Sequence, residues 1–277
     1  MTTKPPRKTI AVVGAFDNLG SLQVRLLEEA HRLGEVTVLL WPHQTSRKHS
    51  GNDPKFPLAE RLYFLRAVRF VTRVIPLNER VSADSLPVLE NFRPSTWVDE
   101  ETSANDLRRK FCREKGLEYR VFSTAQLAGF PEHPSGPTSA ARKKVIVTGS
   151  YDWLHSGHVR FFEEVSAYGD LYAIVGHDAN IRLLKGEGHP LLSQEERRYM
   201  VGSIRYVTQA LISSGEGWLD ADPEIRKLRP DIYAVNEDGD RGGKREYCAK
   251  MGIEYLVLKR VPAPGLPQRS STDLRGF

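Results

Sequence analysis

The chain has 277 residues, of which 40% are hydrophobic and 27% are charged, as expected of a globular protein with a buried core. The net charge is only +5, with lysine and arginine interleaved among acidic residues, so we expect small phosphorylated substrates rather than nucleic acid. No apolar run is long enough to span a membrane, and the opening MTTKPPRK lacks the apolar core of a signal peptide, which predicts a cytoplasmic protein.

Residues 14–40 begin a pattern that occurs twice in the chain. Shifted by 135 residues, they match residues 149–175, with identical amino acids at many positions. A shift of 136 aligns ERLYFLRAVRFVTRV with ERRYMVGSIRYVTQA, and RPSTWVDE with RPDIYAVN. Matching over most of both halves predicts two copies of one fold. We expect a first domain over 1–128, a Pro-, Gly- and Ser-rich linker over 129–142, and a second domain over 143–277.

The two cysteines, Cys112 and Cys248, coincide when the copies are aligned. They are too few for a disulfide framework and too far apart for a zinc motif, so we expect buried free thiols.

In the second copy, strand-like and helix-like segments alternate along the chain. We expect strands at 143–149, 171–176, 229–235 and 254–260, and helices at 158–169, from Ser193 onward and at 244–252. Alternating β and α elements predict an α/β fold of two tandem Rossmann-like domains, each a parallel sheet flanked by helices. Ligands of such sheets bind beyond the carboxyl ends of the strands.

The sequence GSYDWLHSGH at 149–158 places two histidines where the first strand gives way to a helix. We expect this helix to begin at or near His158, so that His155 and His158 donate hydrogen bonds to phosphate oxygens at its N-terminus. Gly149 and Gly157 keep backbone bulk low there. Fixed donors of this kind assist displacement at an α-phosphate. Two alternatives remain, zinc ligation by histidines three residues apart, or a helix cap beside a surface residue.

This motif, with the later RYV and RSSTDLRG, resembles the HxGH nucleotidyltransferases, and among them the cytidylyltransferases that make CDP-alcohols. The resemblance covers residues 143–275. It implies an enzyme that converts CTP and a phosphorylated alcohol or sugar to a CDP-linked product and pyrophosphate, with Mg²⁺. The acceptor phosphate would attack the α-phosphorus directly. An ATP-using adenylyltransferase and a non-catalytic nucleotide-binding regulatory protein are the alternatives.

The resemblance also implies roles for individual residues. His155 and His158 would contact the triphosphate and Lys185 the substrate phosphates, while Trp218 would lie near the acceptor. The remaining nucleotide-binding candidates are Gly149, Ser150, Tyr151, Asp152, Gly157, Asp178, Arg197, Asp238, Arg260, Ser271, Thr272 and Arg275. Ser271 and Thr272 would cap a C-terminal helix that holds the β and γ phosphates. Asp152 and Asp178 could also orient hydrated Mg²⁺. Isolated basic residues on solvated faces and a packed loop tryptophan are the simpler interpretations.

In the first copy, the histidine motif is replaced. Gly20, Leu22 and Gln23 stand where the second copy has His155, Gly157 and His158. The leucine would crowd a polyphosphate and the glutamine carries no charge, so we expect a catalytically inactive domain. It could serve a structural, regulatory or substrate-binding role, with an intramolecular pseudo-dimer or a homodimer as the assembly.

Overall fold

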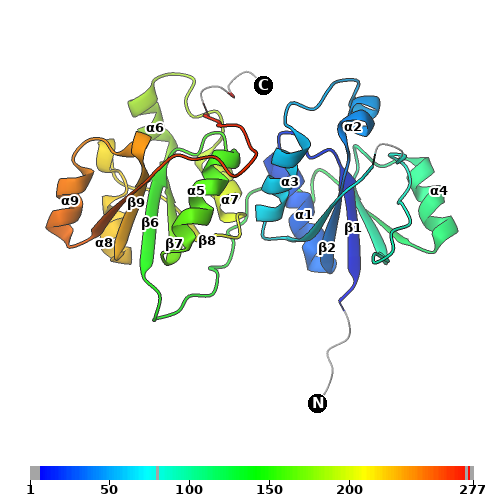
Figure 1. The fold of residues 1–277 in the computed structure, drawn as a ribbon, viewed down its shortest axis with the longest axis horizontal. Coiled ribbons are helices and arrows are strands. Elements are labelled where there is room, and N and C mark those ends of the chain that lie inside the picture. The colour runs from blue at the N-terminus through cyan, green and yellow to red at the C-terminus, as the bar shows by residue number, and fades with distance from the viewer. Residues whose placement is uncertain (1–6, 79–80, 272–273, 275–277) are drawn as a thin grey trace, which may run out of the picture. The chain divides into compact units, whose positions relative to one another are not determined.

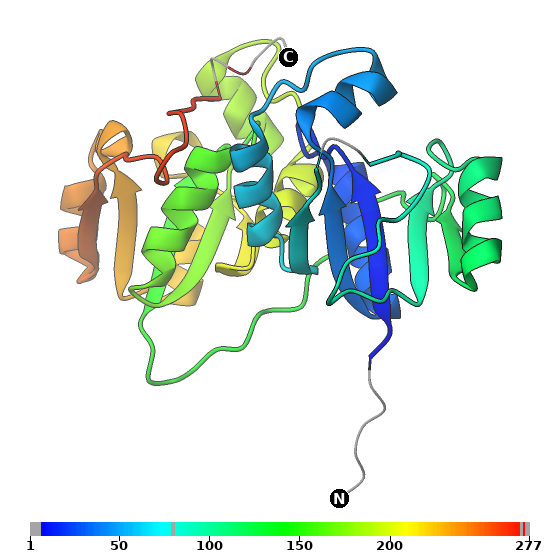
Figure 2. The same ribbon diagram turned by 45° about the vertical axis from the view of Figure 1, so that its right-hand side comes forward.

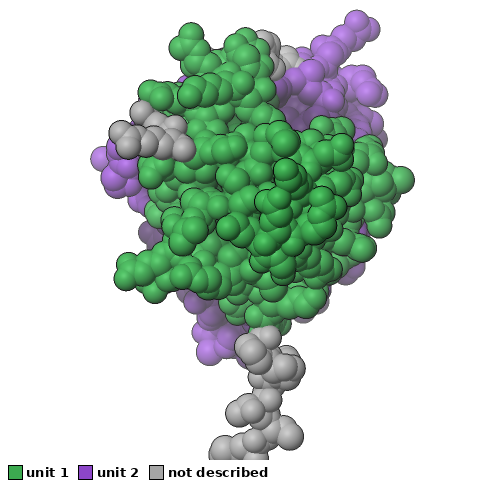
Figure 3. Space-filling model, turned by 90° about the vertical axis from the view of Figure 1, so that its right-hand side faces the viewer, with its two compact units in different colours: residues 1–129 green, residues 130–277 purple. Residues whose placement is uncertain are grey.

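The structure, a computed structural model, describes residues 7–78, 81–271 and 274. It divides into two compact units, Met1–Gly129 (unit 1) and Phe130–Phe277 (unit 2), which Figure 3 colours separately. Residues 130–142, expected as a linker, belong to unit 2. There the Gly136 N–H donates to the carbonyl of Thr208 over 2.8 Å, and the His133 ring lies 4.7 Å from the ring of Tyr199.

Unit 1 is a five-stranded parallel sheet with strand order β3-β2-β1-β4-β5 (Figure 1). Its elements are β1 (Thr9–Gly14), α1 (Ser21–Leu33), β2 (Glu35–Leu40), α2 (His43–Ser50), α3 (Leu58–Ala67), β3 (Val71–Pro76), β4 (Thr96–Glu100), α4 (Asp106–Lys115) and β5 (Glu118–Phe122).

Unit 2 repeats this topology with strand order β10-β9-β6-β7-β8, again entirely parallel. Its elements are β6 (Lys144–Gly149), α5 (Ser156–Ser166), β7 (Asp170–Val175), α6 (Asp178–Lys185), α7 (Gln194–Gly202), β8 (Val207–Ile212), η1 (Gly217–Leu219), α8 (Asp222–Leu228), β9 (Ile232–Asn236), η2 (Glu237–Gly239), α9 (Lys244–Met251) and β10 (Glu254–Leu258). The predicted α/β class with two tandem copies is confirmed.

Helices cover both faces of the unit 2 sheet, as Figures 1 and 2 show. On one face, Ile146, Ile174 and Tyr233 pack with Ile225 of α8 and Cys248 of α9. The alternate residues of the strands face α5 and α7, because successive side chains of a strand point to opposite sides. All residues of β7, the first four of β9 and residues 145–147 of β6 are buried, which explains why these strands read as apolar runs.

The strands at the centre of the unit 2 sheet separate toward their carboxyl ends. β6 and β9 are paired only through Val145–Ile232 and Ile146–Tyr233, whereas β6 and β7 stay paired as far as Gly149–Val175. The strand order reverses direction between β6 and β9, and such a switch point is where open α/β sheets bind ligands.

Several details differ from the sequence-based expectations. α5 begins at Ser156, with His155 as its N-cap residue, rather than at His158. α6, α8 and β8 were not anticipated. The helix expected after Ser271 lies mostly outside the described residues, as do Thr272 and Arg275, and it stays a prediction; Ser271 itself lies in a turn.

Both cysteines are free and buried, as expected, and burial raises the pKa of Cys112 and of Cys248 to about 11. Among the described residues, no helix combines the length and the apolar character that crossing a bilayer requires.

Candidate active site

The two motif histidines lie together at the N-terminus of α5. His155 caps the helix, and its Nδ1 accepts a hydrogen bond of 3.1 Å from the Gly157 N–H. His158 lies one turn further along, and the two ring centroids are 4.0 Å apart with an interplanar angle of 32°. Because Nδ1 of His155 is an acceptor, the N–H of that ring is at Nε2. The pair therefore presents hydrogen-bond donors at the N-terminus of the helix, where the helix dipole also favours an anion.

His158 occupies an environment that disfavours its charged form. The pKa of His158 is lowered to about 3, first by burial and then by the positive charges of Arg260 and Lys185. Its Nδ1 is buried without a hydrogen-bond partner among the described residues. At neutral pH this ring is uncharged, and the surrounding cations make the site attractive to an anion.

Lys185 reaches this site from the C-terminal end of α6. Its Nζ donates a 2.8 Å hydrogen bond to Oγ of Ser150, in the loop that follows β6. The structure thus brings Lys185 and Ser150 to the edge of the sheet that carries the histidines.

Two glycines of the motif make room for aromatic side chains. A Cβ atom on Gly149 would lie 2.9 Å from the Tyr151 ring, and one on Gly157 would lie 2.9 Å from the His155 ring. Tyr151 is buried, has a φ of 49°, and contacts the His158 ring edge-on at 5.3 Å. The described contacts thus explain both glycines by ring packing, and direct phosphate contact at them stays a prediction.

The segment after β10 passes over the N-terminus of α5 (red in Figure 1). The carbonyl of Arg269 lies 3.6 Å from the position of a Cβ on Gly157, and it accepts a 2.6 Å hydrogen bond from Arg260. Arg260 also pairs with Asp238, which follows β9. Ser271 donates through Oγ to the carbonyl of Trp153, at 3.3 Å. Arg260, Asp238 and Ser271 therefore all lie at the switch point.

A narrow crevice runs between α5 and this C-terminal segment. Residues that the sequence alone did not single out line it, among them Arg160, Asn236, Lys259, Gln268 and Arg269. One feature of the sequence could have indicated this segment. The stretch VPAPGLPQR is rich in proline, which is incompatible with a regular helix or a central strand, and it therefore predicts irregular structure here.

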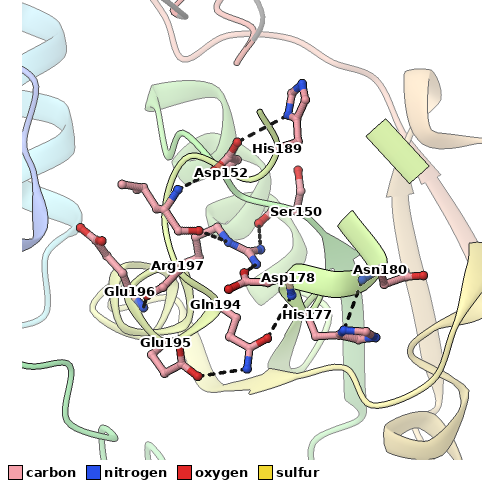
Figure 4. Close-up of polar contacts among 12 residues, drawn as sticks. Ser150, Asp152, His177, Asp178, Asn180, His189, Gln194, Glu195, Glu196 and Arg197 are labelled. Atoms are coloured by element: carbon pink, nitrogen blue, oxygen red, sulfur yellow. Dashed lines mark hydrogen bonds and ion pairs between the residues drawn. The ribbon is translucent and has the colours of Figure 1, made fainter. Parts of the chain in front are cut away.

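Asp152 holds the loop that precedes α7 (Figure 4). Its Oδ1 accepts hydrogen bonds from the backbone N–H groups of Leu191, at 2.7 Å, and Leu192, at 3.1 Å. His189 lies 3.7 Å from its other oxygen.

Arg197 is fully buried and its guanidinium ties three segments together (Figure 4). It donates to the carbonyls of Leu192 and Ser150, and to the carboxylate of Asp178 at 2.7 Å. These bonds use three of its five N–H groups, and the side chain has no exposed surface. The structure thus gives Arg197 and Asp178 a role in positioning the loops around the site.

Unit 1 lacks the histidines but has counterparts of Asp152 and Arg197, namely Asp17 and Arg61, which hold the corresponding loops. Asp17 accepts from the N–H groups of Lys55 and Phe56, as Asp152 does from Leu191 and Leu192. Arg61 donates to the carbonyls of Phe56, Ala15 and Trp41. Persistence of this network in a copy without the histidine motif indicates that it maintains the fold.

Trp218 lies in η1 and is 54% exposed. Its ring borders Gly243, where a Cβ would lie 3.3 Å away. A large exposed aromatic beside the carboxyl edge of a sheet is available to contact a ligand.

No group of three or more histidine, cysteine or acidic side chains suited to holding a metal ion occurs within the described part of the chain. The carboxylates of Asp152 and Asp178 bind backbone amides and Arg197, as described above. These two carboxylates do not form a Mg²⁺ site made of protein ligands alone. In nucleotide sites Mg²⁺ is commonly held through substrate phosphates and water.

Fold and site together define a Rossmann-like protein with a histidine-lined anion site, and comparison with known proteins agrees. Residues 146–276 match the family model described as Cytidylyltransferase-like. A FAD synthase of Ferroglobus placidus is 36% identical over 120 residues, which cover 42% of this chain and 75% of that protein. A FAD synthase of Methanospirillum hungatei is 34% identical over 134 residues, covering 47% and 82%.

The bifunctional protein HldE of Pseudomonas fluorescens is 34% identical over 174 residues, covering 61% of this chain and 34% of that protein. The chain belongs to the cytidylyltransferase-like family and is a nucleotidyltransferase of that family.

Proposed function

We propose that unit 2 transfers a nucleoside monophosphate from a nucleoside triphosphate to a phosphate oxygen of a small phosphorylated alcohol or sugar, releasing pyrophosphate. The observation that carries this proposal is the pair of imidazoles, 4.0 Å apart, at the N-terminus of α5. Donors fixed at this point would stabilise the charge that develops on the α-phosphoryl group and on the departing pyrophosphate.

In this proposal each residue contributes binding or charge stabilisation. Nε2–H of His155 and the ring of His158 donate to phosphate oxygens. Lys185 and Arg260, whose charges already act on His158, neutralise the triphosphate. The acceptor phosphate oxygen forms the new bond to the α-phosphorus as the bond to pyrophosphate breaks, so that no covalent intermediate with the protein is needed.

We infer that binding of the triphosphate changes the protonation of His158. In the ligand-free protein its pKa is lowered to about 3 by burial and by Arg260 and Lys185. A bound triphosphate brings several negative charges to this ring and favours the imidazolium form. Proton uptake on nucleotide binding, measured by calorimetry in buffers of different ionisation enthalpy, is the expected signature.

ATP is the donor that we propose first. Several relatives are named FAD synthase, and the product in that name contains an adenylate group. CTP is the second candidate, supported by the resemblance of the GSYDWLHSGH and RSSTDLRG motifs to cytidylyltransferases. We propose that Mg²⁺ enters as the complex with the triphosphate, since such ions keep water and phosphate ligands.

The acceptor is proposed to approach past Trp218. This exposed indole can cover a ring or an alkyl chain of the acceptor without contacting the reacting phosphate. The acceptor class then includes flavin mononucleotide, itself a phosphorylated alcohol, as well as sugar phosphates.

A pyrophosphate-release assay tests the proposal. Wild-type chain is incubated with Mg²⁺, with ATP, CTP, GTP or UTP, and with a panel of glycerol 3-phosphate, phosphocholine, flavin mononucleotide and sugar 1-phosphates. We expect one triphosphate to support turnover with one acceptor class. Absence of acceptor-dependent pyrophosphate release across the panel would favour the non-catalytic nucleotide-binding alternative if the triphosphate still binds.

A further inference from the structure

Unit 1 contains a hollow of its own at the carboxyl edge of its sheet. The hollow has a volume of about 460 Å³. Thr45, Lys48 and His49 of α2 line one side, and residues 81–84, which follow β3, line the other. All its lining residues belong to unit 1.

Aligning the two copies shows which elements of unit 2 correspond to the walls of this hollow. Aligned with unit 2, α2 corresponds to α6, and residues 81–84 correspond to residues 217–220, which carry Trp218 and precede α8. In unit 1 no helix is found among the described residues between β3 and β4. The irregular segment that takes the place of η1 and α8 thus forms one wall of a ligand-sized space.

A buried polar network lies behind this wall. Arg108 is 1% exposed; its Nη1 donates to Asp99 at 2.5 Å, and its Nε donates to Asp84 at 3.2 Å. The hydroxyl of Tyr119 donates to Asp99 at 2.8 Å. Asp84 also lines the hollow, so it connects the network to the open space.

Unit 2 lacks this network. By the repeat, Val235 and Lys244 occupy the positions of Asp99 and Arg108. Val235 is part of the apolar core of unit 2. A buried ion pair at the corresponding place in unit 1 costs desolvation, which an ordinary apolar core avoids. Maintaining the fold, a role that both units share, therefore does not explain why unit 1 has this buried ion pair.

One donor of the network has no partner. Nη2 of Arg108 is buried and forms no hydrogen bond with the described residues. In a planar guanidinium, Nη2 and Nε share one edge, and here Nε donates to Asp84. One of the two N–H groups of Nη2 therefore lies on the side of Asp84. Leaving a buried charged donor unpaired is costly, so this network is not explained by the stability of unit 1.

The rim of the hollow adds positive charge. Lys48 is exposed, and no carboxylate of the described residues lies within ion-pair distance of it. His49 packs edge-on against Trp41, with ring centroids 4.8 Å apart. Thr45 and Ser82 add hydroxyl groups and Val81 and Ala83 add apolar surface, so the lining is mixed and carries both signs of charge.

We propose that unit 1 binds a small phosphorylated polyol or sugar in this hollow. Lys48 and His49 hold the phosphate, while Asp84, held in place by Arg108, accepts hydrogen bonds from the alcohol groups. Because unit 1 has Gly20 and Gln23 in place of the motif histidines, the site binds its ligand without nucleotidyl transfer.

Fluorine NMR of the full chain, labelled with 5-fluorotryptophan, tests this proposal. The chain has four tryptophans, Trp41, Trp97, Trp153 and Trp218, whose signals are assigned by single replacements with phenylalanine. Ribose 5-phosphate and glycerol 3-phosphate are the probes, with inorganic phosphate and ribose as their separate halves. We expect saturable movement of the Trp41 signal with a Kd of roughly 1 mM or tighter.

Titrations of the His155→Ala, His158→Ala double variant remove the contribution of the unit 2 site, and the Trp41 movement is expected to persist there. Lys48→Ala should weaken the binding seen at Trp41 about tenfold, the effect of losing one charge-assisted hydrogen bond. Arg47→Ala removes a charge from the same helix at a residue outside the hollow and should leave affinity unchanged.

Well-dispersed tryptophan signals in each variant confirm that it is folded. The proposal is overturned if no probe moves the Trp41 signal, if Lys48→Ala binds as tightly as wild type, or if only the Trp153 and Trp218 signals respond. It is also overturned if inorganic phosphate binds as tightly as the sugar phosphates, because the alcohol groups then contribute nothing.

Discussion

Unit 1 and unit 2 have the same strand order and the same buried loop-holding network, yet only unit 2 carries paired histidines. Asp17 and Arg61 repeat the contacts of Asp152 and Arg197. Unit 1 can therefore serve as the control for unit 2. Features present in both units maintain the fold, and features present in one unit are the candidates for function.

The loop after the first strand illustrates this separation. Phe16 and Tyr151 occupy equivalent positions with φ values of 47° and 49°, and each ring packs over the glycine that ends the strand. The strained loop and its ring belong to the fold. What unit 2 adds around this ring is His158, which the Tyr151 ring contacts edge-on.

Loss of the histidines should give the largest effect. Replacing His155 and His158 with alanine is expected to lower kcat/KM at least about 10³-fold, since removing a single preorganised donor costs about 10²–10³. Folding stability should change little, because unit 1 folds with Gly20 and Gln23 at these positions. Steady-state pyrophosphate release and urea unfolding measure the two effects.

Gln23→Ala in unit 1 is the matched control and should leave turnover at the wild-type level. Normal turnover in the histidine double variant, or a comparable loss in Gln23→Ala, would remove the functional distinction between the units.

The shared network should lose stability in both units when its arginine is removed. Arg197→Ala and Arg61→Ala are each expected to destabilise their own unit by roughly 3 kcal/mol, because each leaves buried carbonyls unpaired, and Arg197→Ala also strands a carboxylate. Urea unfolding followed by circular dichroism measures this. If Arg197→Ala abolished turnover with unchanged stability, Arg197 would act on substrate and not on the loops.

The pH dependence of stability should distinguish His158 from its counterpart in unit 1. The folded-state pKa of His158 is about 3, below the ordinary value of 6.5, so the unfolded chain binds more protons between these values. This contribution is fully present above about pH 6.5 and is lost as the pH falls toward 3. His158→Gln, which copies Gln23, should flatten the slope between pH 3 and 6.5 in urea unfolding; an unchanged slope would exclude this assignment.

The smallest expected effect concerns the hydroxyl of Tyr151, which is buried without a partner among the described residues. Tyr151→Phe copies Phe16 and should raise the stability of unit 2 by about 1 kcal/mol, because a buried unpaired hydroxyl is removed. Phe16→Tyr is the reverse change and should lower the stability of unit 1. Thermal unfolding compares both, and destabilisation by Tyr151→Phe would show that this hydroxyl has a structural partner.

The sequence was sufficient for the repeat, the α/β class and the placement of the histidines at a helix N-terminus. These features depend on local patterns, namely apolar runs, helical periodicity and the GSYDWLHSGH motif. The role of Arg197 could not be read in this way. Its partners Ser150 and Leu192 are brought to it by the fold, and an arginine beside a glutamate in sequence gives no sign that it is buried.

Segments that lack regular structure were the least predictable. In the C-terminal region, Ser271 donates to Trp153 and Arg269 reaches α5 through its carbonyl, and the sequence pattern indicated neither contact. The hollow of unit 1 likewise depends on residues 81–84 replacing a helix. Backbone contacts across such distances carry no periodic signal in sequence.

A crystal structure of the full chain with a non-hydrolysable triphosphate analogue and Mg²⁺ tests the central distinction most directly. The account predicts the triphosphate at the N-terminus of α5, within hydrogen-bond distance of His155 and His158 and close to Lys185. Triphosphate bound at the N-terminus of α1, or held in unit 2 without contact to either histidine, would contradict it.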